Sequence, residues 1–307
     1  MKTTTTPKIE EIEKTSNLFL WRSIKHVIMK RPVLLNHVLA FGLLFITSLI
    51  PIRQAAHARD NTPKNFDPPF VFQAAGPTAD SIQSTVDAFR AALGNPNLNN
   101  PGPLSSGRRE INWDGGDPTI TATTVPVTPF NVFLNTRGAQ FTTPGIGLSQ
   151  AAPSGLAVLF NNPTYDDIFS TFSPSRLFTP VGSNITEALF FVPSTNGADR
   201  ATVTGFGAVF TDVDQPNGSG PGKKKGNRGA STLMEYFDAY GKLLFSSFVP
   251  ASPGDGSLSF FGVVFDDARI ARVRITTGDV APGPDDDGKN DIVMMDDFIY
   301  GEPQPLK

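Results

Sequence analysis

The sequence predicts an all-β fold, a β-sandwich or jelly roll that carries one N-terminal amphipathic helix. From Arg108 onward, short apolar runs separated by Gly, Pro, Asn and Asp follow one another with almost no helical periodicity. Phenylalanine is the main aromatic core residue, with 25 Phe against 4 Tyr and 2 Trp. After residue 58 only four of the 26 acidic residues are glutamate, and aspartate favours turns whereas glutamate favours helices.

The first 58 residues have the pattern of a secretory leader. The basic stretch Lys30–Pro32 precedes a mostly apolar segment, residues 33–50, and Ala56–Ala58 provides a small-x-small cleavage site. A start of translation at Met29 would give this leader an ordinary length. The apolar segment is short for a membrane span, which needs about 20 residues, so cleavage is favoured over retention as a signal-anchor. We therefore expect a secreted, extracellular or periplasmic product with no stable membrane anchor after cleavage.

Composition excludes several kinds of chemistry for the chain after the leader. Cysteine is absent, and the three histidines, His26, His37 and His57, all lie in the leader. Ser-His-Asp and Cys-His catalysis, zinc held by imidazole or thiolate, and disulfides are thereby excluded. From Arg59 onward there are 18 basic and 26 acidic side chains, a net charge of −8, which argues against nucleic-acid binding.

Residues 59–103 predict a flexible, proline-rich entry segment followed by the one convincing helix, at about 80–93. Asp80 or Ser81 can cap this helix, and Gly94 suits its left-handed stop. Helical spacing gives it a single apolar stripe, which should pack on the end or one face of the β domain. The stripe consists of Ile82, Val86, Phe89 and Leu93.

The β-sandwich is expected over residues 104–303. Val273 and Ile275 alternate with Arg272 and Arg274, so one face of that strand should be apolar and the other solvated. The runs that predict strands are 111–113, 131–134, 139–142, 156–160, 168–172, 185–192, 202–210, 232–237, 243–249, 258–265, 271–276 and 292–300.

Two segments within the sandwich have turn or loop character. Asp238–Gly241 lies between two apolar runs and predicts a hairpin turn. Residues 215–231 are rich in Gly and Lys and too polar to bury, so we expect a mobile loop between neighbouring strands. The spacing of its Gly and Lys residues does not match that of a phosphate-binding loop.

A run of aspartates near residue 285 indicates one candidate calcium site. Calcium takes about six to eight oxygen ligands, which closely spaced aspartates on a tight turn can supply. Asp285 and Asp287 are the candidate ligands, next to Gly288, although the spacing differs from that of an EF-hand. The alternative is a solvent-exposed acidic turn.

Asp296 and Asp297 form a second acidic feature, because they lie inside the apolar strand 292–299. Alternation directs one of these side chains inward, and a buried carboxylate needs an arginine or a metal as its partner. A structural calcium and a buried salt bridge are both open at this point. The first and last strands of such sandwiches often lie close together, which would bring Asn112 or Asp114 towards Asp296 as further oxygen ligands.

Trp113 and the many carboxylates raise the question of a ligand. Trp113 either packs in the core or offers a platform on which a sugar ring stacks. Two carboxylates held about 5 to 10 Å apart across a cleft could hydrolyse glycosides, but no local motif marks such a pair.

Five short motifs carry a family resemblance. They are GAQFTTPG at 138–145, VTGFGAVF at 203–210, MEYFDAYG at 234–241, FFGVV at 260–264 and MDDFIYG at 295–301. Together they resemble the secreted bacterial jelly-roll domains common among exosortase-sorted (PEP-CTERM) surface proteins. The closing motif is also similar to the last strand of jelly-roll carbohydrate-binding modules. This resemblance implies a jelly-roll fold, export, and a structural-calcium ligand at Asp296 or Asp297.

These observations favour an exported, non-catalytic β-sandwich that binds a glycan or an extracellular matrix component, with calcium as a structural ion. One alternative is a structural or adhesive matrix protein without a soluble ligand. The other is a glycan-cleaving enzyme that uses paired carboxylates.

Overall fold

The structure is a computed structural model, and it describes four segments of the chain. These are residues 67–115, 125–216, 232–284 and 290–306. Contacts divide the chain into two units, Met1–Asn61 and Thr62–Lys307, and every described residue belongs to the second. The leader, the Gly- and Lys-rich loop beyond residue 216, and the candidate ligands Asp285 and Asp287 lie outside the described residues.

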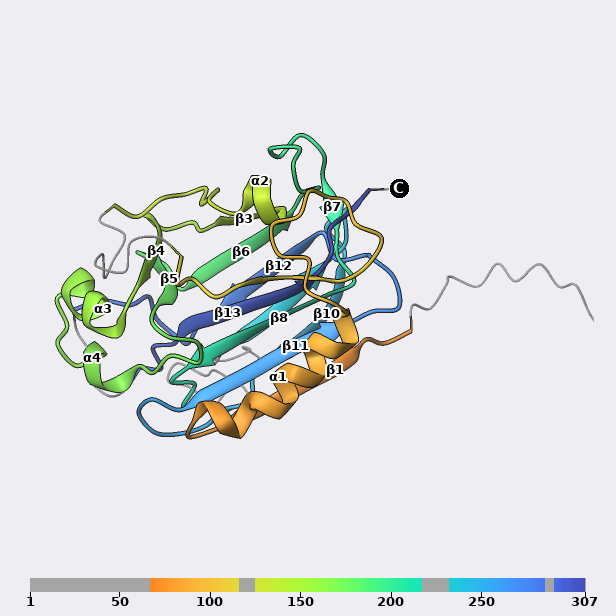
Figure 1. The fold of residues 1–307 in the computed structure, drawn as a ribbon. Coiled ribbons are helices and arrows are strands. Elements are labelled where there is room, and N and C mark those ends of the chain that lie inside the picture. The colour runs from red at the N-terminus through yellow and green to blue at the C-terminus, as the bar shows by residue number, and fades with distance from the viewer. Residues whose placement is uncertain (1–66, 116–124, 217–231, 285–289, 307) are drawn as a thin grey trace, which may run out of the picture. The chain divides into compact units, whose positions relative to one another are not determined.

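The described chain is mostly β-structure in antiparallel sheets, which confirms the predicted all-β class (Figure 1). In the larger, seven-stranded sheet, six strands follow in the order β1-β11-β8-β13-β5-β4, and β2 pairs with β13. The bounds of these strands are β1 Phe70–Gly76, β2 Arg108–Ile111, β4 Gly147–Ala151, β5 Leu177–Val181, β8 Gly205–Thr211, β11 Leu258–Val264 and β13 Met294–Gly301.

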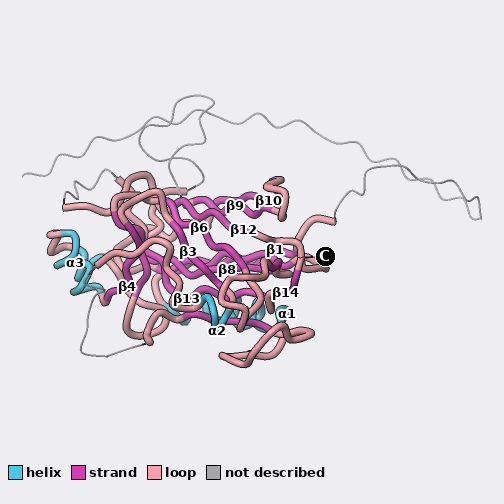
Figure 2. The backbone as a smooth tube through the Cα atoms, turned by 90° about the horizontal axis from the view of Figure 1, so that it is seen from above, coloured by secondary structure: helices cyan, strands magenta, loops and turns pink. Residues whose placement is uncertain are grey.

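A second sheet of five strands has the order β10-β9-β12-β6-β3, and a short pair joins β14 to β7. Seen from above, the five strands form a layer apart from β1, β8 and β13 (Figure 2). The bounds are β3 Ala139–Thr142, β6 Ile185–Phe190, β7 Ala201–Thr202, β9 Leu233–Phe237, β10 Leu243–Phe248, β12 Arg272–Thr276 and β14 Gln304–Pro305.

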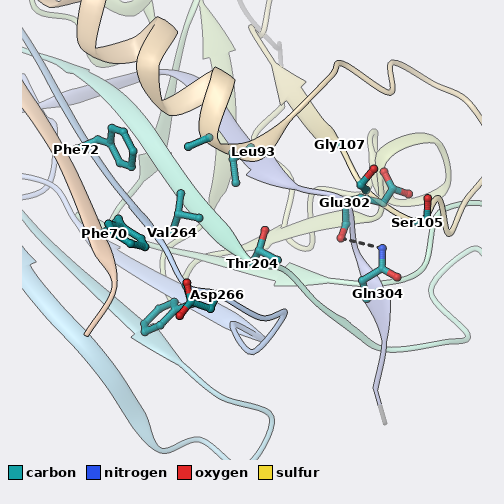
Figure 3. Close-up of a pocket in the computed structure, with 13 residues that line it drawn as sticks. Phe70, Phe72, Leu93, Ser105, Gly107, Thr204, Val264, Asp266, Glu302 and Gln304 are labelled. Atoms are coloured by element: carbon teal, nitrogen blue, oxygen red, sulfur yellow. Dashed lines mark hydrogen bonds between the residues drawn. The ribbon is translucent and has the colours of Figure 1, made fainter. Parts of the chain in front are cut away.

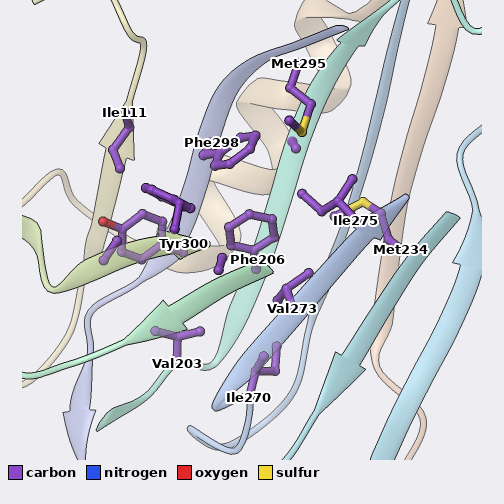
Figure 4. Packing of buried hydrophobic residues seen from close by; sticks show 14 of the residues in the cluster. Ile111, Val203, Phe206, Met234, Ile270, Val273, Ile275, Met295, Phe298 and Tyr300 are labelled. Carbon is purple, nitrogen blue, oxygen red and sulfur yellow. The ribbon is translucent and has the colours of Figure 1, made fainter. Parts of the chain in front are cut away.

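The two large sheets share one hydrophobic cluster. Phe206 on β8 and Phe298 and Tyr300 on β13 belong to the larger sheet, and they pack with Val273 and Ile275 on β12 of the second (Figure 4). All five side chains are fully buried. Each buried aromatic or branched aliphatic side chain contributes about 1.5–3 kcal/mol, so this cluster stabilises the packing of the two sheets.

Strand β12 shows the alternation that its sequence predicts. Val273 and Ile275 are buried, whereas Arg272 and Arg274 lie on the opposite, partly exposed face. Both arginines pair with Glu187 on β6, at 2.7 Å each. The two arginines therefore share one acidic neighbour within the same sheet.

Helix α1 (Ala79–Leu93) covers the face of the larger sheet that is turned away from this cluster. It lies along β1 and β11 (Figure 1). Phe89 rests on Gly207 and Gly262, where an added Cβ would come within 2.9 and 2.8 Å of its ring atoms. Glycine at these two positions thus lets the helix approach the sheet closely. With one face covered by the helix and the other by the shared cluster, β8 is buried at every residue.

The first strand corrects a prediction. Residues 70–76 were expected to belong to a flexible entry segment, but they form β1, which pairs with β11 from Phe70↔Val264 to Gly76↔Leu258. Phe72 and Ala74 pack against the cluster beneath α1. The prolines that indicated flexibility lie just outside this strand, so they bound it instead of breaking it.

Three short helices also differ from the predicted strands. The runs 131–134, 156–160 and 168–172 were read as strands, whereas the structure has α2 (Leu134–Arg137), α3 (Pro153–Phe160) and α4 (Tyr165–Ile168) at or beside them. A proline in the first turn of α3 favours helix, and a short apolar run does not distinguish helix from strand. In the described ranges, no helix has the length and apolar character needed to cross a membrane.

A buried ion pair ties β2 to the residues that follow β13. The Arg109 side chain is fully buried and the Glu302 side chain is 1% exposed. Arg109 Nε lies 2.5 Å from Glu302 Oε2, and Nη2 lies 2.8 Å from Oε1. Asn97 Nδ2 and the backbone N–H of Leu104 also donate to this carboxylate, at 2.8 and 3.1 Å. Both carboxylate oxygens therefore have two donors each.

Candidate functional site

The acidic strand β13 is distorted where Asp296 and Asp297 occur. Its pairing with β8 passes from Met295↔Phe210 directly to Phe298↔Ala208, so β13 contains one extra residue at this bulge. Alternation along the strand predicted that one of the two aspartate side chains points inward. In the structure both side chains are buried, with 0% of Asp296 and 3% of Asp297 exposed. The extra residue interrupts the alternation.

Asp297 has an arginine partner, which is one of the two alternatives that the sequence left open. Arg90 Nη2, on α1, lies 3.2 Å from Asp297 Oδ2. The Ser173 hydroxyl donates to Asp297 Oδ1 at 2.7 Å. Burial raises the pKa of Asp297, and the contacts with Ser173 and Arg90 limit that rise.

Asp296 is held by neutral donors. The backbone N–H of Phe172 donates to Asp296 Oδ2 at 2.6 Å, and Ser173 Oγ lies 3.3 Å from Oδ1. Burial, and next the negative charge of Asp297, raise the pKa of Asp296 well above its ordinary value. Its ionised form therefore lacks a compensating positive charge among the described residues that it contacts.

The structure places Asn112 and Asp114 beside this pair. Asp114 Oδ1 accepts hydrogen bonds from the backbone N–H groups of Ser175 and Arg176. Asp114 Oδ2 accepts one from Asn112 Nδ2 at 3.0 Å and lies 3.3 Å from Ser173 Oγ. The pairing of β2 with β13 brings these distant segments together.

Three carboxylates thus converge on one hydroxyl, and we call this group the carboxylate cluster: Asn112, Asp114, Ser173, Asp296 and Asp297. Each carboxylate has one oxygen held by N–H donors or Arg90, and its other oxygen lies within 3.3 Å of Ser173 Oγ. A hydroxyl has a single hydrogen, so it can satisfy only one of them.

The carboxylate cluster suits a hard cation such as calcium, because three carboxylates and one hydroxyl offer oxygen ligands. Within the described ranges, no three His, Asp or Glu side chains enclose an ion as they stand. A bound ion would therefore require the carboxylates to turn away from Ser173. The other predicted ligands, Asp285 and Asp287, lie outside the described residues.

Ser173 and Arg90 were not identified from the sequence. Ser173 lies in the segment between α4 and β5, and Arg90 lies in the last turn of α1. Neither belongs to an acidic motif, and both reach the site only through tertiary structure. The one available signal was that a buried aspartate requires a partner.

Trp113 corrects the sugar-platform interpretation. The side chain is fully buried, and its ring stacks on Phe178 with centroids 3.8 Å apart and planes 3° from parallel. Its edge contacts include Phe141 and Phe298. The indole Nε1–H donates to the carbonyl oxygen of Asp296 at 2.9 Å. Trp113 therefore packs in the core and fixes the backbone of the carboxylate cluster.

An amphipathic pocket of about 450 Å³ lies where β1 begins and α1 and β11 end, near the C-terminal segment (Figure 3). Phe70, Phe72 and Val264 give it an apolar wall, and Thr204 and Asp266 add polar groups. Phe70 is 66% exposed, which is unusual for a phenylalanine in a strand.

A second pocket, of about 490 Å³, shares the lining residue Gln304 with the first. Its most prominent residue is Tyr240, which is 94% exposed in the turn between β9 and β10. Asp267 and Arg269, which form an ion pair, supply polar groups. We call these two pockets the end groove.

The turn that carries Tyr240 is internally fixed. Asp238 Oδ1 accepts hydrogen bonds from the backbone N–H groups of Tyr240 and Lys242, both at 2.9 Å. The backbone N–H of Gly241 donates to the carbonyl of Asp238 at 3.1 Å. The hairpin turn was predicted correctly, but its role in positioning an aromatic side chain was not.

No family model, curated protein or solved structure matches this chain.

Proposed function

We propose that this protein is an exported, non-catalytic β-sandwich that binds a glycan in the end groove. The observation that carries the proposal is Tyr240, an aromatic ring 94% exposed beside a pocket of about 490 Å³. A sugar ring has apolar C–H faces that stack on an aromatic ring and hydroxyls that need polar partners at its edges. Asp267, Arg269 and Gln304 provide such partners around Tyr240.

The extent of the end groove supports an oligosaccharide as the ligand. Phe70 and Tyr240 are exposed aromatic residues, one lining each pocket, and Gln304 lies in the lining of both. Ring-stacking positions separated by a polar segment suit a chain of sugars better than a single compact ligand. The fixed turn beneath Tyr240 reduces the entropy lost on binding.

The fold that we propose is a jelly-roll sandwich with an N-terminal helix packed on it. Two antiparallel sheets sharing one core support the sandwich, and the burial of the apolar stripe of α1 supports the helix. The leader pattern and the resemblance to exosortase-sorted surface proteins support export.

Calcium is the second part of the proposal. In the carboxylate cluster, Asp114, Asp296 and Asp297 would hold the ion, with the carbonyl of Asn112 and the hydroxyl of Ser173 as further oxygen donors. Bound calcium would supply the positive charge that Asp296 lacks. The ion would then link β2 to β13 and stabilise that end of the sheet.

We favour binding over catalysis because of the way the carboxylates are placed. In the carboxylate cluster, oxygens of Asp296 and Asp297 lie within 3.3 Å of the same hydroxyl and are buried. Glycoside hydrolysis needs two carboxyl groups about 5 to 10 Å apart on either side of an accessible bond. The cluster therefore suits an ion better than a sugar.

The Tyr240→Ala substitution tests the binding proposal. We expect the parent protein to retain oligosaccharides on a glycan array and the variant to lose at least tenfold in affinity, because the stacking surface is removed. Tyr240→Phe keeps the ring and should retain most of the affinity. Val158→Ala removes another highly exposed side chain, on α3, and should change nothing. Silence of the parent protein on the array would favour the structural or adhesive alternative.

A further inference from the structure

A third pocket, of about 400 Å³, lies between α1, β2 and α2. Its lining contains three guanidinium groups, those of Arg90, Arg108 and Arg137, and two carboxylates, Glu110 and Asp297. One positive charge is therefore in excess, although acidic residues outnumber basic ones in the chain as a whole. This arginine pocket is defined by those five residues.

Two of the three arginines are neutralised within the protein. Arg90 Nη2 lies 3.1 Å from Glu110 Oε2 and 3.2 Å from Asp297 Oδ2. Arg108 pairs with the other oxygen of Glu110. Both carboxylates of the pocket are thus used by Arg90 and Arg108.

Arg137 is the arginine that has no acidic partner. Its Nε donates to Asn99 Oδ1 at 2.9 Å, and its Nη1 donates to the carbonyl oxygen of Glu110. Its guanidinium carbon lies 5.1 Å from the centre of the Phe133 ring. Among the described residues, no carboxylate forms an ion pair with Arg137, and its Nη2 has no acceptor.

The surroundings of Arg137 destabilise its positive charge. A guanidinium group in such an environment binds an anion most strongly. Burial lowers the pKa of Arg137 and the nearby positive charge of Arg109 acts in the same direction, whereas Tyr300 and Glu110 partly oppose this shift. Arg109 itself is already paired with Glu302. An anion in the arginine pocket would therefore meet a preorganised, partly desolvated guanidinium.

We propose that the arginine pocket binds the anionic group, a carboxylate or a sulfate, of an acidic saccharide, and that Arg137 recognises it. Nη2 of Arg137, which has no acceptor among the described residues, can donate to the oxygens of such a group. The volume of the pocket suits a ligand of the size of a sugar residue. This site shares no lining residue with the end groove, so it does not depend on the proposal for Tyr240.

Isothermal titration calorimetry with matched charged and neutral probes tests this proposal. The carboxylate probe is trigalacturonate, compared with its methyl ester, and the sulfate probe is a carrageenan tetrasaccharide, compared with its desulfated form. We expect the parent protein to bind at least one charged probe and to bind its neutral counterpart at least tenfold more weakly. Affinity should also fall as salt is raised, because the contact is ionic.

Two variants assign the binding to Arg137. Arg137→Gln removes the charge, and Asn99→Asp places a carboxylate beside Arg137 Nε without changing the size of the side chain. Each should lower the affinity for the charged probe at least tenfold. Asn99→Asp also adds an ion pair, so this variant should fold, and its melting temperature should be at least as high as that of the parent protein. Asn100→Asp is the matched control, because it adds the same charge at an exposed position with no side-chain contact to Arg137.

Three outcomes would overturn the proposal. The first is that the parent protein binds neither charged probe. The second is that charged and neutral probes bind equally well. The third is that Asn99→Asp and Asn100→Asp weaken binding to the same extent, since the effect would then come from net charge.

Discussion

Glu302→Ala should lower the free energy of unfolding by about 3–5 kcal/mol, which is among the largest effects expected from a single substitution in this protein. The substitution leaves the Arg109 guanidinium charged and fully buried, with no carboxylate partner. It also removes the acceptor for Asn97 Nδ2 and for the backbone N–H of Leu104. Unfolding in guanidinium chloride, followed by circular dichroism, measures the loss.

Two controls separate the buried pair from surface electrostatics. Glu187→Ala removes a carboxylate that pairs with Arg272 and Arg274 on a partly exposed face. This substitution should lower the free energy of unfolding by about 1 kcal/mol or less. The double variant with Arg109→Met and Glu302→Leu should recover the part of the lost stability that comes from the unpaired charge, while Asn97 Nδ2 and the Leu104 N–H still lack their acceptor. Equal losses for Glu302→Ala and Glu187→Ala would contradict this interpretation.

Calcium should raise the melting temperature at pH 7.5 and have no effect at pH 4.5. Stabilisation by a ligand at about 100 times its dissociation constant is about 2.7 kcal/mol, which corresponds to about 5–10 °C for a domain of this size. Calcium binds ionised carboxylates, and the pKa of Asp296 is raised, so acid removes the ligands by protonation. Differential scanning calorimetry in calcium and in EGTA measures the difference.

Another aspartate, Asp291, which lies outside the carboxylate cluster, predicts how stability depends on pH without calcium. Burial raises the pKa of Asp291 to about 7, although the backbone N–H groups of Asp214 and Gln215 donate to its oxygens. A carboxyl whose pKa is higher in the folded state than in the unfolded state favours folding when it is protonated. Stability should therefore fall as pH rises from about 4, the unfolded value, to about 7.

Substitutions locate the calcium effect in the carboxylate cluster. Asp296→Asn should abolish the calcium-dependent rise in melting temperature, because it removes a charged ligand at the centre of the cluster. Asp255→Asn, at an exposed aspartate outside the cluster, should leave the rise intact. Identical melting temperatures in calcium and in EGTA at pH 7.5 would contradict the calcium part of the proposal. The ion pair between Arg90 and Asp297 would then be the charge compensation in the carboxylate cluster.

Features that depend on local pattern were predictable from the sequence. The alternation of Val273 and Ile275 with two arginines identified a half-buried strand, and Asp238–Gly241 identified a hairpin turn. Asn112 and Asp114 were expected to approach Asp296 because their segment and the closing strand should meet. The structure brings them together, although the strand that pairs with β13 is β2 and the first strand, β1, pairs with β11.

Features that depend on tertiary structure were not predictable. The bulge that buries both Asp296 and Asp297 arises from pairing with β8, which no local pattern reveals. Trp113 is equally compatible with a core or a surface position until Phe178 is known to lie against it. Tyr240 is a candidate binding residue because its side chain is exposed, and Arg137 because it has no acidic partner. The neighbouring sequence predicts neither property.

The most direct test of the account is the map of amide chemical-shift changes when an oligosaccharide retained by the parent protein is added to isotopically labelled protein. We expect the largest changes to fall on Tyr240, Asp267 and Gln304 and to extend towards Phe70. Changes confined to the opposite face of the second sheet, around Arg272 and Glu187, would contradict it. So would a map that is the same for the parent protein and for Tyr240→Ala.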